Sequence, residues 1–345
     1  MTTPVEGDGA AEPDEALDAL ITRADLDGLI RLIDARTASG DWPGLSRLRS
    51  RARFAINTGR QLWPAATLAE YRLSLLAPPA WACRAINDGG GRFAIGPLTE
   101  VVAQHHRWDE LAPWLDPGPA AMLVAHERII RGEILDPALT ASFGPDPLEL
   151  TLSLQSWEPV YPPVVYTDHG LQADPPTLPA AGDFRAMAPR RSVERLDDPA
   201  VEQAVRQLIE PWTAGSNGRA EVITVGGDAD DAVGALGAPE QLGRLASLTP
   251  AEGLAWLAWA GASGGAHGRR RGGGVGRFGA WWMLAAIADA TDAWPVDPGD
   301  LGAIAAELSW YWWEAGDPVG GWQLQLAIHD PIDGVAWAIN ARDQA

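Results

Sequence analysis

The chain has 345 residues, of which 46% are hydrophobic, and a formal net charge of −20 at pH 7. It is long enough to bury one large core or two ordinary ones, and its acidity opposes binding to nucleic acid or anionic membranes unless a local basic patch is present. All 26 basic residues are arginine, which excludes P-loop, kinase-type and pyridoxal-phosphate chemistry that needs a lysine from this chain.

Cysteine content and the termini indicate the compartment. Cys83 is the only cysteine, so one chain cannot form an intramolecular disulfide, a CxxC zinc site or an iron–sulfur cluster. The N-terminus has no basic region followed by an apolar one, and no uncharged apolar run approaches membrane-spanning length. We therefore expect a cytoplasmic protein without a signal peptide, a membrane association or a cofactor.

The first part of the chain has helical signals. Residues 1–13 are acidic and rich in Gly and Pro, which predicts a disordered lead-in. From 14 to 144, apolar residues recur at helical spacing between Pro and Gly breaks, which predicts a helical domain that is bundle-like or solenoid-like. Beyond the first two helices, the expected helical segments are 43–58, 64–77, 97–105, 109–115 and 119–132.

A change of pattern near 141–147 predicts a boundary, with an α+β domain from 145 to 345 that contains a small, mostly antiparallel sheet. The fold class is therefore α+β, with an all-helical N-terminal half packed on this second half. Residues 168–192 are expected to be a long loop. Expected strands are 148–155, the edge segment 162–166, 221–225, 310–314, 322–328 and 335–340 (the last a strand or a short helix), and expected helices are 200–209 and 298–308.

The stretch from Leu248 to Ala290 organises the second domain. Thr249, followed by Pro250 and then Glu252, forms a predicted capping box with Pro at the first helical position. Two apolar helices then flank a Gly/Arg-rich segment from Gly264 to Arg277. That segment contains the basic residues His267, Arg269, Arg270, Arg271 and Arg277.

These arginines have two interpretations. Each can pair with Asp or Glu of the protein and so tie helices to the sheet, or the group can hold a phosphate or carboxylate ligand together with backbone amides at a helix start. We favour the first interpretation and keep His267 and the four arginines as candidate anion-binding residues.

Two glycine motifs lie in the same stretch. Residues 274–279 match G-x-G-x-x-G, but the dinucleotide fingerprint needs a preceding strand, and glycines and an arginine stand there instead. Residues 261–265 match G-x-S-x-G, and Ser263, Asp317 and His329 occur in hydrolase order, yet the capping box at Thr249 predicts a helix before Ser263 rather than the strand of a nucleophile elbow. A serine hydrolase remains only a rival interpretation.

Acidic and aromatic residues allow two further interpretations. Asp228, Asp230 and Asp231 follow a predicted strand and can hold Mg²⁺, but an N-cap at Asp228 with two acids in the first helical turn is the favoured interpretation, so no metal is expected. Tryptophans can stack on sugars; Trp310, Trp312 and Trp313 fall on both faces of a strand, which favours burial in the core.

Several motifs resemble an actinobacterial family, domain of unknown function 6183. The resemblance covers most of the chain and implies no activity and no catalytic residues. The residues that carry it are Gly59-Arg60-Gln61-Leu62-Trp63-Pro64, Ala69-Glu70-Tyr71-Arg72-Leu73, Gly96-Pro97-Leu98-Thr99-Glu100, Ala125-His126-Glu127-Arg128, and Gly264 to Arg271 with Gly276-Arg277-Phe278 and Trp281-Trp282.

The leading functional expectation is a non-enzymatic cytoplasmic interaction or scaffold protein that binds a protein partner. The alternative is an enzyme or sensor that binds a small anionic metabolite through the arginines, with Asp228, Asp230 or His267 supplying acid–base or metal chemistry. Neither nucleic acid nor a membrane is an expected partner.

Overall fold

The computed structural model describes residues 14–89, 96–188, 191–239, 241–316 and 320–344. The chain forms two compact units, Met1–Leu98 and Thr99–Ala345. The two units divide at 98/99, and the predicted boundary at 144/145 lies within unit 2. The predicted lead-in at 1–13 lies outside the described residues.

Unit 1 is helical in its described part. Aspartates cap three of its helices: Asp14, Asp25 and Asp41 each accept a hydrogen bond from the backbone amide three residues further on. Leu17, Leu29 and Leu45 are among the apolar residues that form its core. The helices are α1 (Glu15–Arg23), α2 (Leu26–Ser39), α3 (Trp42–Asn57), α4 (Trp63–Leu76) and α5 (Pro79–Asn87).

A buried ion pair joins α3 to α4 within this core. Arg49 and Glu70 are 1% and 0% exposed, and Arg49 Nε lies 3.2 Å from Glu70 Oε1. Arg49 also donates to Asp88, which follows α5. A single guanidinium thus connects three helical segments of unit 1.

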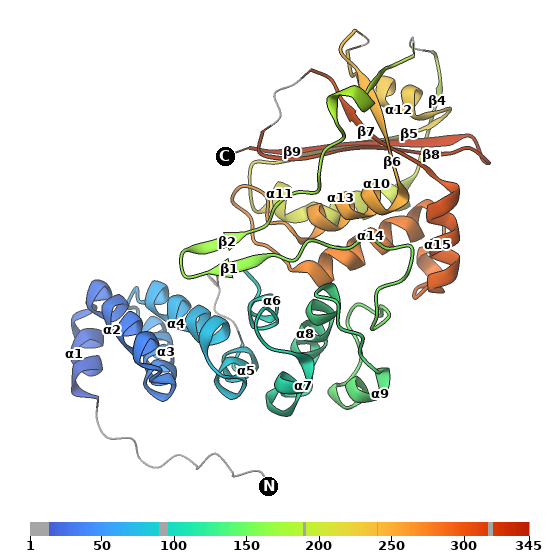
Figure 1. The fold of residues 1–345 in the computed structure, drawn as a ribbon. Coiled ribbons are helices and arrows are strands. Elements are labelled where there is room, and N and C mark those ends of the chain that lie inside the picture. The colour runs from blue at the N-terminus through green and yellow to red at the C-terminus, as the bar shows by residue number, and fades with distance from the viewer. Residues whose placement is uncertain (1–13, 90–95, 189–190, 240, 317–319, 345) are drawn as a thin grey trace. The chain divides into compact units, whose positions relative to one another are not determined.

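Unit 2 begins with short helices and continues into an α+β arrangement (Figure 1). Its helices are α6 (Leu98–Val102, which starts at the boundary residue), α7 (Trp108–Leu111), α8 (Pro119–Ile130), α9 (Pro137–Thr140), α10 (Pro199–Leu208), α11 (Glu210–Ala214), α12 (Ala229–Ala235), α13 (Pro250–Ala262), α14 (Gly273–Ile287) and α15 (Pro298–Glu307). Its strands are β1 (Val165–Thr167), β2 (Gly170–Gln172), β3 (Arg185–Ala186), β4 (Glu194–Leu196), β5 (Arg219–Gly226), β6 (Arg244–Leu248), β7 (Ser309–Glu314), β8 (Trp322–Asp330) and β9 (Val335–Asp343).

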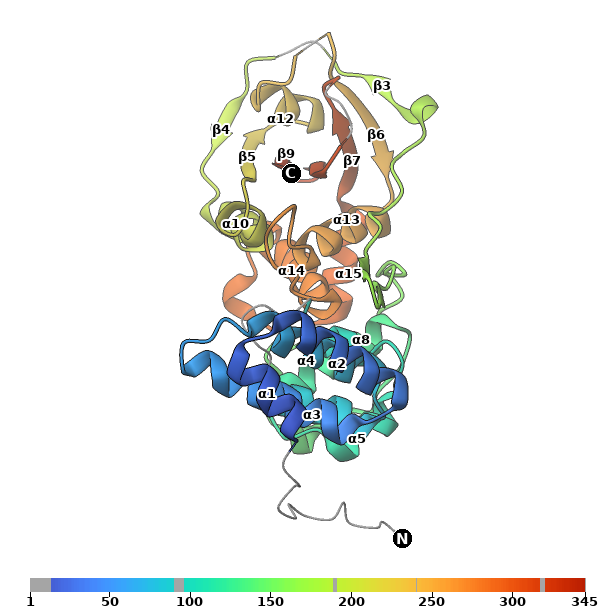
Figure 2. The same cartoon turned by 90° about the vertical axis from the view of Figure 1, so that its left-hand side faces the viewer.

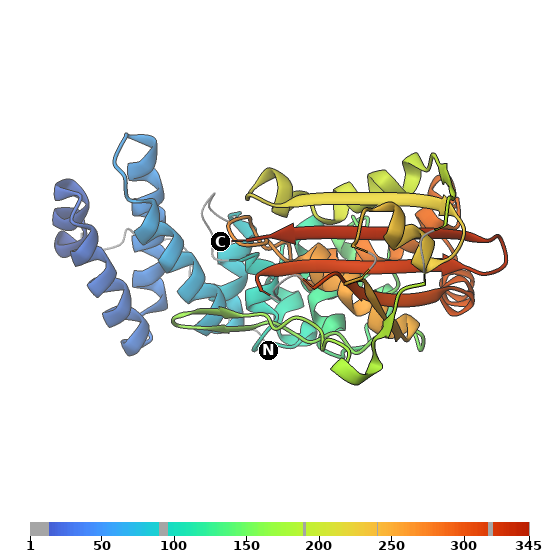
Figure 3. The same cartoon turned by 90° about the horizontal axis from the view of Figure 1, so that it is seen from above.

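The main sheet has seven described strands in the order β3-β6-β7-β8-β9-β5-β4, and each described pair is antiparallel. β8 and β9 are joined by a tight turn and run side by side along most of the sheet (Figure 3). The α+β class and the antiparallel sheet are thereby confirmed.

Helices cover the two faces of this sheet unequally. The helices α10, α13 and α14 lie on one face, and α12 lies on the other (Figure 2). Trp310, Trp312, Leu326 and Ile339 are among the sheet residues that face the larger layer and share its core. The prediction that Trp310, Trp312 and Trp313 are core residues is confirmed, since each is at most 3% exposed.

The helix pair at the centre of unit 2 forms as the sequence predicts. Thr249 Oγ1 accepts from the Glu252 amide, and the Glu252 carboxylate accepts from the Thr249 amide, so the capping box is present. α13 ends at Ala262, α14 starts at Gly273, and the two helices pack against each other (Figure 1).

The predicted strand at 148–155 is wrong, although its burial pattern is right. Leu148, Leu150 and Leu152 are all at most 9% exposed, but the segment has no sheet partner among the described strands. Its backbone groups are bound elsewhere: the amides of Leu148 and Leu150 donate to Asp146, and the Leu152 carbonyl accepts from Leu135. The alternation of apolar and polar residues indicates which side chains face the core, but it does not indicate which groups the backbone bonds to.

Other elements match the predictions more closely. The strand at 221–225 is part of β5, those at 310–314 and 322–328 are β7 and β8, and 335–340 is a strand, β9. The short strands β3, β4 and β6 were not predicted, and β2 and β3 lie inside the segment expected to be a loop. In the part of the chain that the structure describes, no helix combines the length and the apolarity needed to cross a bilayer.

Gly276 allows α14 to approach α13, and we expect it to be intolerant of a side chain. A Cβ atom there would lie 2.2 Å from the Ala258 carbonyl oxygen and 2.8 Å from the Ala262 side chain, so Gly276→Ala forces the helices apart. The expected loss in the free energy of unfolding is about 1–3 kcal/mol, measured by chemical denaturation.

Gly279→Ala is the matched control in the same helix. Its Cβ meets only the tip of the Leu208 side chain, and alanine has a higher helix propensity by about 1 kcal/mol. The free energy of unfolding should change by less than about 1 kcal/mol in either direction. Equal losses in the two variants would show that the backbone approach at Gly276 has no special role.

Candidate functional site in unit 2

The segment between α13 and α14, here called the arginine loop (Gly264–Gly272), is tightly anchored. The Arg271 amide donates to the Ala262 carbonyl at 2.8 Å. The Arg271 side chain donates to three further backbone carbonyls, those of Gly261, Gln207 and Leu208. These bonds satisfy carbonyls near the C-terminal ends of α10 and α13 that the helices themselves leave open.

The middle of the loop is anchored to the C-terminal strand. The Ala266 amide donates to Asp343 Oδ2 at 2.6 Å, and the His267 amide donates to Ser216 Oγ, which itself donates to Asp343. Close packing requires glycine here, because a Cβ on Gly268 would lie 2.2 Å from the Pro211 carbonyl oxygen. Asp343 is 1% exposed, so the loop is attached to a buried carboxylate.

His267 and Arg269 are the basic residues of the loop that are exposed. The hydrogen bonds that anchor the loop come from its backbone and from Arg271, so they do not use these two side chains. The fold therefore presents an imidazole and a guanidinium on a loop that is hydrogen-bonded at several points.

Arg277, in the first turns of α14, is buried in an ion pair with Glu158. Both side chains are 0% exposed, and Arg277 Nε and Nη2 each lie 2.7 Å from a Glu158 oxygen. Burial acts to raise the pKa of Glu158, but the hydrogen bonds and charge of Arg277 hold it below its ordinary value. Arg277 also donates to the carbonyls of Thr151 and Ser153, which are the backbone groups that a sheet would otherwise have bound.

Arg270 forms a second bidentate pair, with Glu100 of α6. Its Nε and Nη2 lie 2.7 and 2.8 Å from the two Glu100 oxygens. Glu100 also accepts from the Tyr166 hydroxyl at 2.6 Å and from the Gly273 amide at 3.1 Å. Burial and the neighbouring Glu100 carboxylate raise the pKa of Tyr166, so this hydroxyl donates a hydrogen bond and does not ionise.

Glu127 of α8 is a second buried carboxyl group beside Glu100. It is 3% exposed, and its Oε1 accepts from the Gly274 amide at 2.9 Å. Burial and the charge of Glu100 raise the pKa of Glu127 to about 8, against the opposing effects of the Gly274 amide, Arg270 and Arg131. At neutral pH this group is mostly a neutral carboxylic acid.

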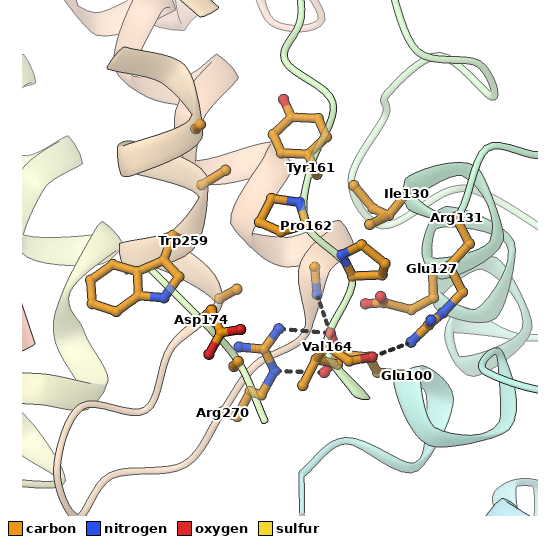
Figure 4. A pocket seen from close by; sticks show the side chains of 16 residues that line it. Glu100, Glu127, Ile130, Arg131, Tyr161, Pro162, Val164, Asp174, Trp259 and Arg270 are labelled. Carbon is orange, nitrogen blue, oxygen red and sulfur yellow. Dashed lines mark hydrogen bonds and ion pairs between the residues drawn. The ribbon is translucent and has the colours of Figure 1, made fainter. Parts of the chain in front are cut away.

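A small cavity lies among these groups (Figure 4). Its free volume of about 30 Å³ admits a water molecule or a group of similar size. Glu100, Glu127, Arg131, Asp174 and Arg270 supply its charged lining. Its apolar lining includes Ile130, Tyr161, Pro162, Pro163, Val164, Ala255, Ala258, Trp259 and Ala262.

Arg131 lies on the α8 side of this cavity, close to Glu127 (Figure 4). Its Nη2 donates to the Val164 carbonyl at 2.9 Å, while its Nε is buried without an acceptor among the described residues. Desolvation by burial lowers the pKa of this guanidinium, although an arginine stays protonated at physiological pH. The cavity thus contains charges of both signs close together.

Residues 27–345 match the model of a family of unknown function, DUF6183. The chain belongs to this family. No curated protein and no solved structure matches it. The match extends over both compact units, and in this DUF6183 member the buried glutamates and the arginine loop lie within the matched region.

Neither glycine motif has the context its chemistry needs. Residues 274–279 of this DUF6183 chain lie inside α14 and not in a loop after a strand, so the dinucleotide interpretation is wrong. Ser263 follows the helix α13, and its Oγ accepts from the Gly265 amide, so there is no nucleophile elbow. His329 is on β8, and Asp317 lies outside the described residues.

The aspartates after β5 form a cap, as the favoured interpretation holds. Asp228 and Asp231 make a reciprocal capping box at the start of α12. Arg191 pairs with both of them, and Arg185 pairs with Asp230. Among the described residues, no group of three or more His, Cys, Asp or Glu could hold a metal ion.

Sequence reasoning named the arginines of this site but missed the glutamates. Glu100, Glu127 and Glu158 are each isolated acids in the sequence, far from Arg270 and Arg277 along the chain, and only the fold brings them together. One available signal was that acids almost never lie fully buried without a partner, combined with the apolar surroundings of Glu127 in Ala121–Ile130.

The Arg277–Glu158 pair should make a large contribution to folding. Arg277→Met leaves Glu158 buried without its counter-ion, and the expected loss in the free energy of unfolding is about 3–5 kcal/mol. Arg269→Met, in the same stretch but exposed, should change it by less than about 0.5 kcal/mol. Chemical denaturation of both variants tests this, and a loss for Arg277→Met no larger than that for Arg269→Met would contradict it.

The raised pKa of Glu127 predicts a pH-dependent stability. Between about pH 4.5, its ordinary value, and pH 8, the folded protein keeps a proton that the unfolded chain has lost. The free energy of unfolding therefore falls as pH rises through this window, by up to about 1.4 kcal/mol per pH unit, and levels off above it.

Glu127→Gln removes this titration and keeps the oxygen that accepts from Gly274. Its free energy of unfolding, measured from pH 5 to 9, should rise relative to the native chain up to about pH 8 and then stay parallel to it. Glu202→Gln, at an exposed position of α10, should follow the native curve throughout. Parallel curves for Glu127→Gln over the whole range would contradict a protonated Glu127.

Proposed function

We propose that the protein is a non-enzymatic interaction protein of the cytoplasm that binds an acidic surface of a partner protein through the arginine loop. The observation that carries the proposal is the contrast within one loop. Arg271 and the backbone amides anchor it, while His267 and Arg269 are exposed. A basic surface group on a chain of net charge −20 attracts an acidic partner locally while the rest of the chain repels it.

The anchoring favours recognition because it removes the cost of ordering the loop. Binding ordinarily fixes mobile side chains and loops, which reduces affinity, and a loop that is already held loses less freedom. The anchor points belong to α10, α13 and β9, so three elements of unit 2 fix the position of the exposed pair.

An anionic metabolite is the alternative ligand, and it would have to use the same exposed pair. Arg270 and Arg277 each hold a glutamate with two hydrogen bonds, so a phosphate or carboxylate at either would have to displace a buried carboxylate. The Arg271 side chain donates to three backbone carbonyls, so His267 and Arg269 are the exposed residues among the five candidates. This geometry favours a protein surface, which two exposed groups on a loop can meet directly, over an enclosed metabolite.

Charge reversal of Arg269 tests the proposal. The native chain, Arg269→Glu and Arg206→Glu are used to capture partners from cells that express the protein. Arg206 is an exposed arginine on α10 that bonds only to Gln203 among the described residues. We expect a partner that binds the native chain and Arg206→Glu equally and binds Arg269→Glu at least tenfold more weakly, with the difference reduced at high salt.

A thermal-shift panel of phosphate, nucleotides, sugar phosphates and divalent metals distinguishes the alternative. Stabilisation of the native chain by an anion, lost in Arg269→Glu, would replace the protein partner with a metabolite. A partner that binds Arg269→Glu as well as the native chain would contradict the role of the loop.

A further inference from the structure

An open hollow lies on the α12 face of the main sheet, where the sheet continues past that helix. Ala336 and Ala338 of β9 pack in the apolar core beneath α12. Asn340 and Arg342 follow on the same face and line the hollow, on the part of β9 that runs past α12 toward the C-terminus (Figure 1). Its volume of about 590 Å³ is within the range of small-molecule sites, about 300–1,000 Å³.

The change from apolar to polar side chains occurs in the same row of three neighbouring strands. The register pairs Glu221 of β5 with Asn340 of β9, and it pairs Asn340 with Gln325 of β8. The next row pairs Arg219 with Arg342. Gln325 is 3% exposed, and its Nε2 is buried without an acceptor among the described residues. Because a buried amide without a hydrogen bond is unfavourable, this polar row is more than a solvated surface.

Two arginines lie directly opposite each other in the hollow. Arg219 and Arg342 are register partners on adjacent antiparallel strands, and both line the hollow, so their Cβ atoms are roughly 5 Å apart and their like charges repel. Arg342 Nε donates to Asn340 Oδ1 at 3.1 Å. Arg219 is exposed and makes no hydrogen bond or ion pair among the described residues. An anion bound between the two guanidiniums removes this repulsion.

We propose that this hollow binds the carboxylate of a small aliphatic acid, with Arg219 and Arg342 as its counter-ions. The two oxygens of a carboxylate can accept from both guanidiniums at once. Glu221 also lines the hollow, on the same face as Arg219 and two residues along β5. Its carboxylate repels a second negative charge, which disfavours a phosphate dianion or a dicarboxylate. The lining of the hollow includes neither His267 nor Arg269.

Apolar residues in the lining select the rest of the ligand. Leu236 and Pro239, in the segment after α12, belong to this lining, as do Trp313 of β7 and Ala315 after it. Trp313 Nε1 donates to the Ile339 carbonyl at 3.0 Å, so the indole already has its hydrogen-bond partner and offers the ligand apolar surface. A short hydrocarbon chain can lie against these side chains while its carboxylate meets the arginines.

Calorimetric titration of the full chain, at pH 7 and low salt, tests the proposal. Sodium acetate and sodium butyrate are the probes, and butyramide and sodium phosphate are the controls. The affinity should rise about two- to fourfold for each methylene added from acetate to butyrate, because the chain meets the apolar lining, and it should fall as salt is added. Butyramide has the shape of butyrate without its charge and should bind about tenfold more weakly, as should phosphate.

Charge-removing variants locate the site. Arg219→Gln should weaken butyrate binding about tenfold, whereas Arg206→Gln, at an exposed position of α10, should bind as the native chain does. Glu221→Gln should strengthen binding about two- to fivefold because it removes a repulsion, and Glu202→Gln should not. Without ligand, the unfolding temperature of Arg219→Gln should be no lower than that of the native chain, since the variant relieves the arginine pair. Its loss of binding then reflects the missing charge.

Several results would overturn the proposal. They are butyrate binding by Arg219→Gln as tight as by the native chain, butyramide binding as tight as that of butyrate, phosphate binding tighter than that of butyrate, and no binding of butyrate by the native chain. Loss of butyrate binding in Arg269→Glu, with Arg219→Gln unaffected, would move the anion to the arginine loop. None of these results depends on a protein partner of that loop, so the two proposals fail separately.

Discussion

Buried guanidinium–carboxylate pairs are the interaction on which unit 2 depends. Arg277 and Glu158 are both removed from solvent, and taking two such charges out of water costs several kcal/mol per ion before their attraction is counted. The pair persists because all three guanidinium nitrogens are hydrogen-bonded, to both Glu158 oxygens, to the Thr151 carbonyl and hydroxyl and to the Ser153 carbonyl. Trp281 adds a donor to the carboxylate and an aromatic face near the guanidinium.

The charged side chains also explain how a segment without regular secondary structure can lie inside the core. Buried backbone groups must find hydrogen-bond partners, and the segment around Leu148–Ser153 finds them in side chains: Asp146 for its amides and Arg277 for its carbonyls. Glu100 does the same for the first amide of α14, at Gly273. A few charged side chains therefore replace a strand ladder and a helix cap, which ties α6, α8 and α14 into one unit.

The sequence predicts the elements of this fold better than their partners. The capping box at Thr249, the helices α13 and α14 and the strands β5, β7, β8 and β9 follow from local signals, since spacing, caps and alternation are properties of neighbouring residues. The strand predicted at 148–155 failed because alternation reports burial and not pairing. The short strands β3, β4 and β6 were missed since two to five residues carry too little pattern to recognise.

In the candidate site, too, the sequence shows which residues are unusual but not which residues they contact. Arg269, Arg270, Arg271 and Arg277 stand out because they are concentrated in one acidic chain, and composition alone shows this. Tertiary contacts give each arginine a different environment. Arg277 and Arg270 pair with glutamates more than a hundred residues away in sequence. Arg271 donates to helix carbonyls, and Arg269 is exposed. No local rule distinguishes four arginines within nine positions of one another.

Glu127 has no bidentate arginine partner, because the nearby arginines bind other groups. A fork-shaped guanidinium satisfies one carboxylate with two parallel hydrogen bonds, so Arg270 is committed to Glu100 and cannot also neutralise Glu127 directly. Arg131 is close, but its Nη2 donates to the Val164 carbonyl. A carboxyl group in this position has two ways to avoid a buried, uncompensated charge: it keeps a proton, or it acquires a cation from outside. Glu127 follows the first course: burial and the neighbouring Glu100 carboxylate raise its pKa, so the carboxyl group keeps its proton.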